Sequence, residues 1–146
     1  MAEQRFDSSD IALCQLLSAI RLYLEDKNFI SALTLSGAAE EILGKHCDAQ
    51  GFPSALWSIK TNSKMFYRAL VGNDLTDKEL DKLYHGIANR HRNKVKHINP
   101  SVEPEMVFDA EEAARDMINR AIDNYWTLGN PLTTEMQLFQ DTVGRI

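Results

Sequence analysis

The residues of this chain best suited to chemistry are Arg92, Asn93 and His97, which lie within six consecutive positions. An arginine side chain carries a planar set of donors that matches the oxygens of a phosphate. A histidine changes charge near neutral pH and can transfer a proton. The amide of Asn93 can orient the imidazole or a phosphate group. The three residues therefore predict a catalytic site that binds a phosphate and moves a proton.

The stretch around these residues is basic, although the chain as a whole has a formal net charge of −5. Residues 85–97 contain four arginines and lysines and no acidic residue. Charge segregated in this way can create a local positive site on an acidic body. The alternative is a solvated basic helix end, because the helix dipole favours cations there. DNA is an unlikely partner, since the total charge is acidic and no helix-turn-helix spacing is present.

Apolar residues recur with helical periodicity along nearly the whole chain, and no segment alternates as a β-strand would. We expect main helices at about 9–26, 29–49, 76–97 and 109–127, one or two short helices within 54–72, and a short last helix from Thr134. Capping patterns mark starts at Thr76 with Glu79 and at Asp109 with Glu112. The prediction is an all-α fold, a four-helix up-and-down bundle with one or two short extra helices, forming one domain over residues 1–146.

The predicted 76–97 helix separates into an apolar and a polar arc on a helical wheel. Its polar arc includes Asn89, Arg92, Asn93, Lys96 and His97. Arg92 and His97 lie about 140° apart near the two edges of that arc, so they face one cleft only if another element supplies a wall. His91 falls on the apolar stripe and is expected to be a hydrogen-bonded core histidine.

The predicted 29–49 helix contributes an acidic pair, Glu40 and Glu41. Small residues crowd its middle at positions 31–39, which predicts a central helix that lies close to its neighbours. Periodicity points Glu41 toward solvent and places Glu40 at the boundary of the apolar face. A half-buried Glu40 could anchor Arg92 or another cation, or it could be a plain boundary glutamate. We assign Glu40, Asn89 and Lys96 supporting roles in the candidate site.

The composition is that of a folded soluble domain, with 44% hydrophobic and 25% charged residues in 146 positions. No apolar run approaches the roughly 18 residues that a membrane span needs, and the N-terminus is not a signal peptide. Cys14 and Cys47 lack metal-ligand spacing and fit two reduced thiols, so a cytoplasmic location is expected. We expect no metal and no cofactor. The large aromatic residues are expected in the core: Trp57, Phe66, Tyr67, Tyr84 and Trp126.

The segment Arg92–His97 resembles the Arg-x4-6-His signature of HEPN domains, which usually place a polar residue directly after the arginine. Residues 31–43 are similar to the small-residue, acid-containing second helix of several HEPN groups. The resemblance covers residues 10–50 and 75–127 and is closest to bacterial HEPN-like sequences. It implies a homodimer with the motif helices facing each other, and a metal-independent endoribonuclease. Arg92 would stabilise the phosphorane, His97 would transfer protons, and DNA would be inert.

Two features keep other functions open. A tyrosine two positions after the histidine is typical of one HEPN toxin branch, and Asn99 occupies that position here. Many HEPN domains also keep the fold without nuclease activity. The alternative prediction is therefore a non-catalytic interaction or regulatory module, or a sensor of a small ligand.

Overall fold

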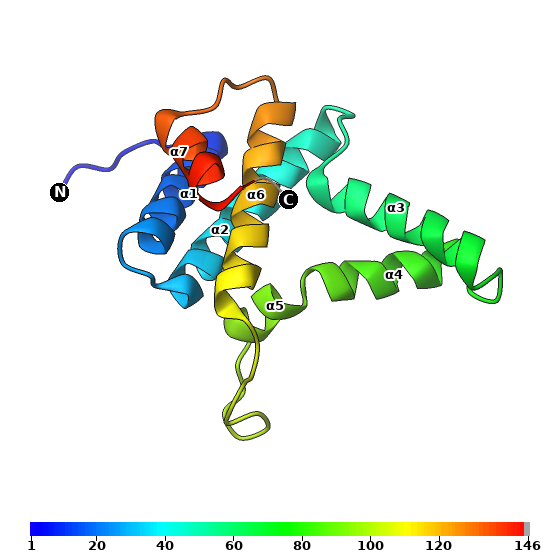
Figure 1. The fold of residues 1–146 in the computed structure, drawn as a ribbon. Helices are drawn as coiled ribbons and strands as arrows, with labels where there is room; N and C mark the ends of the chain where they lie inside the picture. The colour runs from blue at the N-terminus through cyan, green and yellow to red at the C-terminus, as the bar shows by residue number, and fades with distance from the viewer. Residues whose placement is uncertain (145–146) are drawn as a thin grey trace.

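The structure, a computed structural model, describes residues 1–144, and these form helices without any strand (Figure 1). The helices are α1 (Ser8–Leu24), α2 (Phe29–Ala49), α3 (Ala55–Leu70), α4 (Asp77–Ala88), α5 (Arg90–Lys96), α6 (Ala110–Thr127) and α7 (Thr134–Val143). The predicted all-α fold is confirmed. Among the described helices, none combines the length and the apolar character that crossing a membrane requires.

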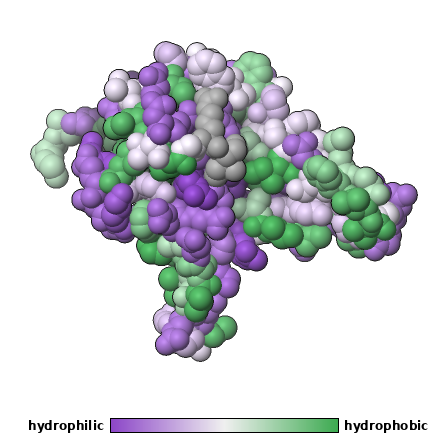
Figure 2. Space-filling model, viewed as in Figure 1, coloured by the Kyte–Doolittle hydropathy of each residue, from purple (hydrophilic) through white to green (hydrophobic). Residues whose placement is uncertain are grey.

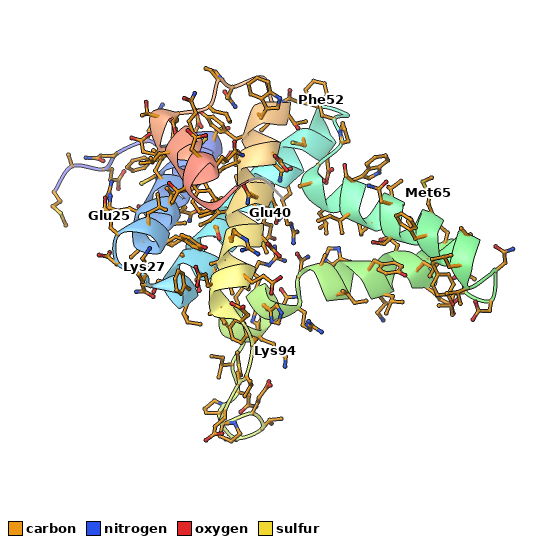
Figure 3. The ribbon with its side chains drawn as sticks, in the orientation of Figure 1. Glu25, Lys27, Glu40, Phe52, Met65 and Lys94 are labelled. Carbon is orange, nitrogen blue, oxygen red and sulfur yellow. The ribbon has the colours of Figure 1, made fainter. Side chains whose placement is uncertain are left out.

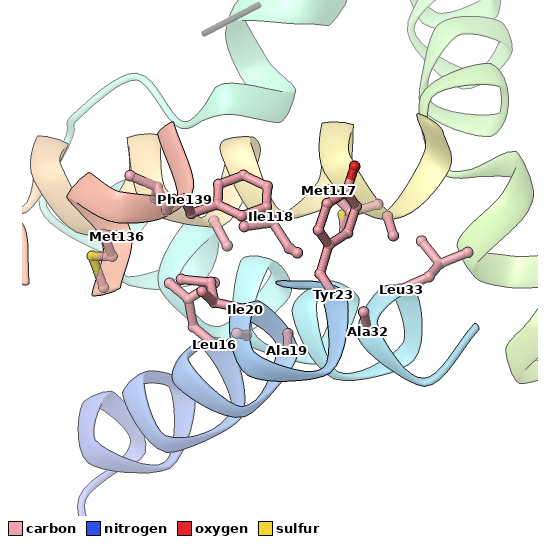
Figure 4. Close-up of a cluster of buried hydrophobic side chains, with 14 of the residues drawn as sticks. Leu16, Ala19, Ile20, Tyr23, Ala32, Leu33, Met117, Ile118, Met136 and Phe139 are labelled. Atoms are coloured by element: carbon pink, nitrogen blue, oxygen red, sulfur yellow. The ribbon is translucent and has the colours of Figure 1, made fainter. Parts of the chain in front are cut away.

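The core lies between α1, α2 and α6, and α7 closes one side of it (Figure 4). The buried cluster includes Leu16 and Ile20 of α1, Leu33 of α2, Ile118 of α6 and Phe139 of α7, all at most 2% exposed. Each fully buried side chain of this kind stabilises the fold by about 1.5–3 kcal/mol. Three long helices and one short one thus form the stable body of the molecule.

Small residues let α2 pack against several neighbours at once, as its sequence predicts. Ala32, Ser36, Gly37 and Ala39 are buried on this helix, which packs against α1, α5 and α6. Small side chains allow helix axes to approach each other closely. The helix α2 is therefore the central element that the candidate site is built on.

Helix starts follow the capping residues read from the sequence. The Thr76 side chain accepts from the Glu79 amide at 3.2 Å, and the Glu79 carboxylate accepts from the Thr76 amide at 2.7 Å. Asp109 caps α6 by accepting from the Glu112 amide at 2.9 Å. Both predicted caps are confirmed, because capping depends on neighbours in sequence. The last helix begins at Thr134 with Thr133 as its cap.

The predicted long helix over residues 76–97 is wrong, because the chain breaks at Asn89 into α4 and α5. Asn89 has φ −106° and ψ 8° and is completely buried. Arg120 of α6 donates to the Asn89 side chain at 2.9 Å and to the Ala88 carbonyl at 2.8 Å. A tertiary contact thus occupies polar groups at the break. As a result α5 packs against α2, whereas α4 packs against α3, and the expected four-helix up-and-down bundle is not confirmed.

The helices α3 and α4 form a hairpin that projects from the body (Figure 1). One helix of 16 residues replaces the one or two short helices expected there, and none of its residues is buried. The prediction that the large aromatic residues lie in the core is wrong for Trp57, Phe66 and Trp126, which are 52%, 68% and 62% exposed. A projecting pair of helices covers only the faces that its two members turn toward each other, so its outer apolar residues remain in solvent.

Candidate functional site

The short helix α5 carries Arg92 and Asn93 and ends beside His97. It packs against α2, with Val95 against the hydrophobic core. Its seven residues include four cations and no acid. The contact with α2 therefore decides which of these cations turn inward and which remain in solvent.

Glu40 lies in the interior, where α2, α5 and α6 meet (Figure 3). Its side chain is 2% exposed, and it accepts from Arg92 Nη1 at 3.3 Å with Oε2 and from Arg120 Nη2 at 2.8 Å with Oε1. The arginine side chains are only 12% and 10% exposed. The structure thus places Glu40 against Arg92, one of the two arrangements considered from the sequence. Buried charges in proteins are paired in this way.

Sequence reasoning missed Arg120, which joins the site from α6. It donates to Glu40, to Asn89 and to the Ala88 carbonyl, and it is 8% exposed. Arg120 and Asn124 are four positions apart on α6. On a helical wheel they lie at one edge of the apolar face, next to Ala113 and Met117. A polar pair beside the apolar stripe was therefore the signal in the sequence that could have identified Arg120 as a site residue.

Gly37 explains how Arg92 reaches the interior. A Cβ at position 37 would lie 2.6 Å from Cδ and 2.7 Å from Cγ of Arg92. These distances are far shorter than an ordinary contact between carbon atoms. Because the guanidinium is held by Glu40, the aliphatic part of Arg92 has little freedom to move aside. The glycine on α2 therefore makes room for the arginine of α5.

Asn89 does not lie on a polar surface as predicted. It is completely buried at the break between α4 and α5, and its Oδ1 accepts from Arg120 at 2.9 Å. The prediction assumed an unbroken helix, which would have turned this residue toward solvent. Asn89 therefore supports the site by binding Arg120 rather than by contacting a ligand at the surface.

His97 and Asn93 differ from Arg92 in their surroundings. His97 is exposed at the C-terminal end of α5, and its backbone amide donates to the Asn93 carbonyl at 3.0 Å. Asn93 is half-buried, with Oδ1 3.5 Å from Arg92 Nη2, a weak hydrogen bond. Within residues 1–144, no ion pair or side-chain hydrogen bond connects His97 with Arg92. One chain thus turns Arg92 inward and His97 outward.

The two lysines of α5 are paired with acids at the surface. Lys96 lies 3.9 Å from Glu41, and Lys94 donates to Glu103 at 3.0 Å. Glu41 also accepts from Lys45, and that hydrogen bond lowers the pKa of its carboxyl group. Exposed pairs of this type contribute about 0–1 kcal/mol. Lys96 therefore meets an acid of α2, but it does not contact the buried pair of Arg92 and Glu40.

His91 does not lie in the core as expected from the apolar stripe, and the hydrogen bond that its Nε2 accepts from Arg90 Nη2 is weak, at 3.4 Å. Its ring is half-buried and stacks on Phe108, with centroids 4.9 Å apart and planes 14° apart. Its Nδ1 is buried and has no hydrogen-bond partner among the described residues. Burial lowers the pKa of His91, and the cations Arg90 and Lys94 lower it further. The ring is therefore neutral at pH 7 and offers a flat surface beside cations.

A hollow of about 700 Å³ opens beside this stacked pair. Four residues of the basic stretch line it: Arg90, His91, Arg92 and Lys94. Further lining residues come from Met106 to Asp109 and from the N-terminal half of α6. Of the three predicted catalytic residues the hollow contains Arg92 alone, so it is not the cleft facing both Arg92 and His97 that the polar arc required. His97 and Asn93 do not line the hollow.

Comparisons with other proteins do not extend this description. The chain gave no significant match to protein-family models, to curated proteins or to solved structures. The resemblance to HEPN domains thus rests on the motif and on the small-residue helix alone. The function must be argued from the geometry of the site.

Acidic residues balance part of the positive charge around the hollow. Asp109, Glu112 and Asp116 line it together with the basic residues. Burial raises the pKa of Asp116, so its carboxyl group holds a proton to higher pH than an exposed aspartate. The arrangement suits a ligand that combines a flat ring with a phosphate. Such a ligand would stack on His91 and Phe108 while its charge met the arginines and Lys94.

Proposed function

We propose that the chain binds single-stranded RNA, with one nucleotide seated in the hollow beside α5. The observation that carries the proposal is the stack of His91 on Phe108 next to Arg90 and Lys94 in one hollow. Base stacking on aromatic rings and cations along the phosphate backbone are the usual means of RNA binding. The three acids of the lining oppose phosphate, so the affinity should be modest and should fall as salt rises.

The double variant R90E/K94E is expected to weaken binding of a short single-stranded RNA at least about tenfold, because two attractive charges become repulsive. Fluorescence anisotropy with a labelled RNA measures the dissociation constant. The matched control is R21E/K27E, which makes the same charge change at exposed positions on and after α1. An equal loss of affinity in both double variants would mean that only total charge matters, and it would contradict a site in the hollow.

Cleavage of RNA is a more specific proposal than binding, and it includes His97 among the residues that act on the RNA. In it Arg92, Asn93 and His97 act on the phosphate without a metal, with His97 transferring protons and Arg92 stabilising negative charge. The exposed ring of His97 supports the proton-transfer role. Arg92 lines the hollow whereas His97 does not, so a second subunit, or a movement of α5, must bring both residues to one phosphate.

Incubation of the purified protein with RNA in excess chelator tests this step. Wild type is expected to cleave RNA and leave DNA of the same sequence intact, and H97A is expected to lose the activity. The products should end in a 2′,3′-cyclic phosphate, because the ribose 2′-hydroxyl is the attacking group. Equal cleavage by wild type and H97A would identify a contaminating nuclease and reject the mechanism.

A second candidate function, a non-catalytic interaction module, is supported by the hairpin of α3 and α4. Large apolar side chains on α3 lie in solvent, including Met65, Phe66 and Leu70 at 66%, 68% and 80% exposure. Hydrophobic residues gather over this arm of the molecule (Figure 2). Exposed apolar patches of several hundred Å² mark surfaces that bind other proteins. This surface adjoins the hollow, because Ile59 of α3 and Ile87 of α4 also line it.

A further inference from the structure

The hollow beside α5 carries cations at two depths. Arg90 and Lys94, the rim cations, line it and are exposed. Arg92 and Arg120, the inner cations, also line it, but their side chains are only 12% and 10% exposed. The RNA binding proposed above uses the rim cations. A ligand that fills the hollow therefore meets a second pair of cations below the first.

The inner cations have hydrogen-bonding capacity that the protein itself does not use. Nε of Arg92 and Nε of Arg120 are buried and have no hydrogen-bond partner within residues 1–144. The same holds for Nδ2 of Asn89, whose Oδ1 accepts from Arg120. Buried donors without a partner are costly, so most of them bind an acceptor in the protein, in the solvent or in a ligand. Donors on both inner cations are therefore available to an acceptor that enters the hollow.

The inner cations also carry more charge than their shared acid neutralises. Both pair with Glu40, whose single negative charge balances only one of the two. Asp116 lines the hollow four positions before Arg120, but its ion pair is with Arg115, at 3.7 Å. A phosphate group supplies both things that this cluster lacks, negative charge and several acceptor oxygens.

The floor of the hollow is the hydrophobic core. Leu33, Ala113 and Met117 belong to the buried core cluster and also line the hollow. An RNA strand cannot continue through the core, so a phosphate that reaches the inner cations has no room for a further nucleotide behind it. A phosphate at this depth is therefore the end of a strand. Such a phosphomonoester carries up to two negative charges at pH 7.

We propose that the hollow recognises the phosphorylated end of a single-stranded RNA. The terminal phosphomonoester binds the inner cations, the next phosphate lies at the rim cations, and the terminal base stacks beside His91 and Phe108. The inference rests on the proposed RNA binding and names the part of the RNA that binds. It also gives Arg120, which the sequence did not single out, a direct contact with the ligand.

Three versions of one short RNA with an internal fluorescent label test this recognition in wild-type protein. They carry a 5′-phosphate, a 3′-phosphate or no terminal phosphate. A phosphate at one end should lower the dissociation constant measured by anisotropy at least about tenfold, because it adds charge-assisted hydrogen bonds. Equal affinity for all three RNAs would overturn end recognition and leave the proposed RNA binding intact. No binding of any RNA would instead reject the proposed function itself.

Adenosine monophosphate, used as an unlabelled competitor, separates an RNA end from a free nucleotide. It carries the phosphomonoester but lacks the next phosphate, which should bind the rim cations. It should therefore bind at least about tenfold more weakly than the preferred phosphorylated RNA. Equal affinity of the nucleotide and that RNA would make the free nucleotide the ligand, and it would overturn recognition of an RNA end.

R92Q and the matched double variant R90Q/K94Q separate the two depths. R92Q should reduce the preference for the phosphorylated end to less than about threefold, with little change for the RNA without a terminal phosphate. R90Q/K94Q should weaken binding of every RNA by a similar factor and keep the preference. The reverse pattern would place the terminal phosphate at the rim and overturn the proposed arrangement.

G37A moves the inner arginine without removing its charge. A Cβ at position 37 would lie 2.6 Å from Cδ of Arg92, so the variant should displace Arg92 and lose the preference as R92Q does. A preference that survived in both variants would show that Arg92 does not bind the terminal phosphate. Circular dichroism verifies that each variant is folded, and the comparison of the three RNAs with wild type decides the matter if either variant is not.

Discussion

E40A is expected to lower the free energy of unfolding by about 3–5 kcal/mol, the largest loss predicted for this chain. Glu40 is the carboxylate that holds both Arg92 and Arg120 in the interior. Without it, two guanidinium groups would remain buried with like charge and no shared acid. Breaking a buried pair by removing one partner costs far more than the pair contributes on balance. Urea unfolding followed by circular dichroism measures the change.

Glu41, the adjacent residue on α2, provides the matched control. Its side chain is 40% exposed, and its partners Lys45 and Lys96 are 75% and 56% exposed. E41A is therefore expected to change the free energy of unfolding by less than about 1 kcal/mol. The comparison removes the same chemical group from neighbouring positions on one helix. A small effect of both substitutions would contradict the role of Glu40 as the centre of a buried charge network.

N124A is expected to lower the free energy of unfolding by about 2–3 kcal/mol. Asn124 of α6 is completely buried. Its Oδ1 accepts from the Ala55 amide at 2.7 Å, and its Nδ2 donates to the Glu40 carbonyl at 3.2 Å. Removal of the amide leaves the first turn of α3 without this partner and loosens the contact between α6 and α2. Thermal and urea unfolding of the variant test the prediction.

Asn119 is the control for this second prediction, because it is another buried asparagine of α6. It is 7% exposed, and neither its Oδ1 nor its Nδ2 has a hydrogen-bond partner among the described residues. N119A removes no hydrogen bond, so the expected loss is less than about 1 kcal/mol. If both variants lost the same stability, the lost side-chain volume rather than the hydrogen bonds of Asn124 would explain the change.

The sequence predicted those parts of the fold that depend on neighbouring residues. The caps at Thr76 and Asp109 and the full extent of α2 follow from interactions within three or four positions. The apolar periodicity of α1, α2 and α6 predicted a core, since only one face of each helix can be buried. The same local reasoning gave the basic character of α5. The chemical roles of Arg92, Asn93 and His97 stay predictions.

Only the tertiary structure decided where the charged and aromatic side chains lie. Glu40 and Arg120 are 80 positions apart, and no periodicity could pair them, because a helical wheel gives a face and not the neighbour that covers it. Arg120 also binds the buried Asn89 at the break in the predicted 76–97 helix, and Glu40 also binds Arg92 in the interior. The projecting hairpin then leaves Phe66 and Trp57 in solvent, although their apolar character favours burial. Local rules thus determined which segments are helices, while long-range contacts determined which residues form the site.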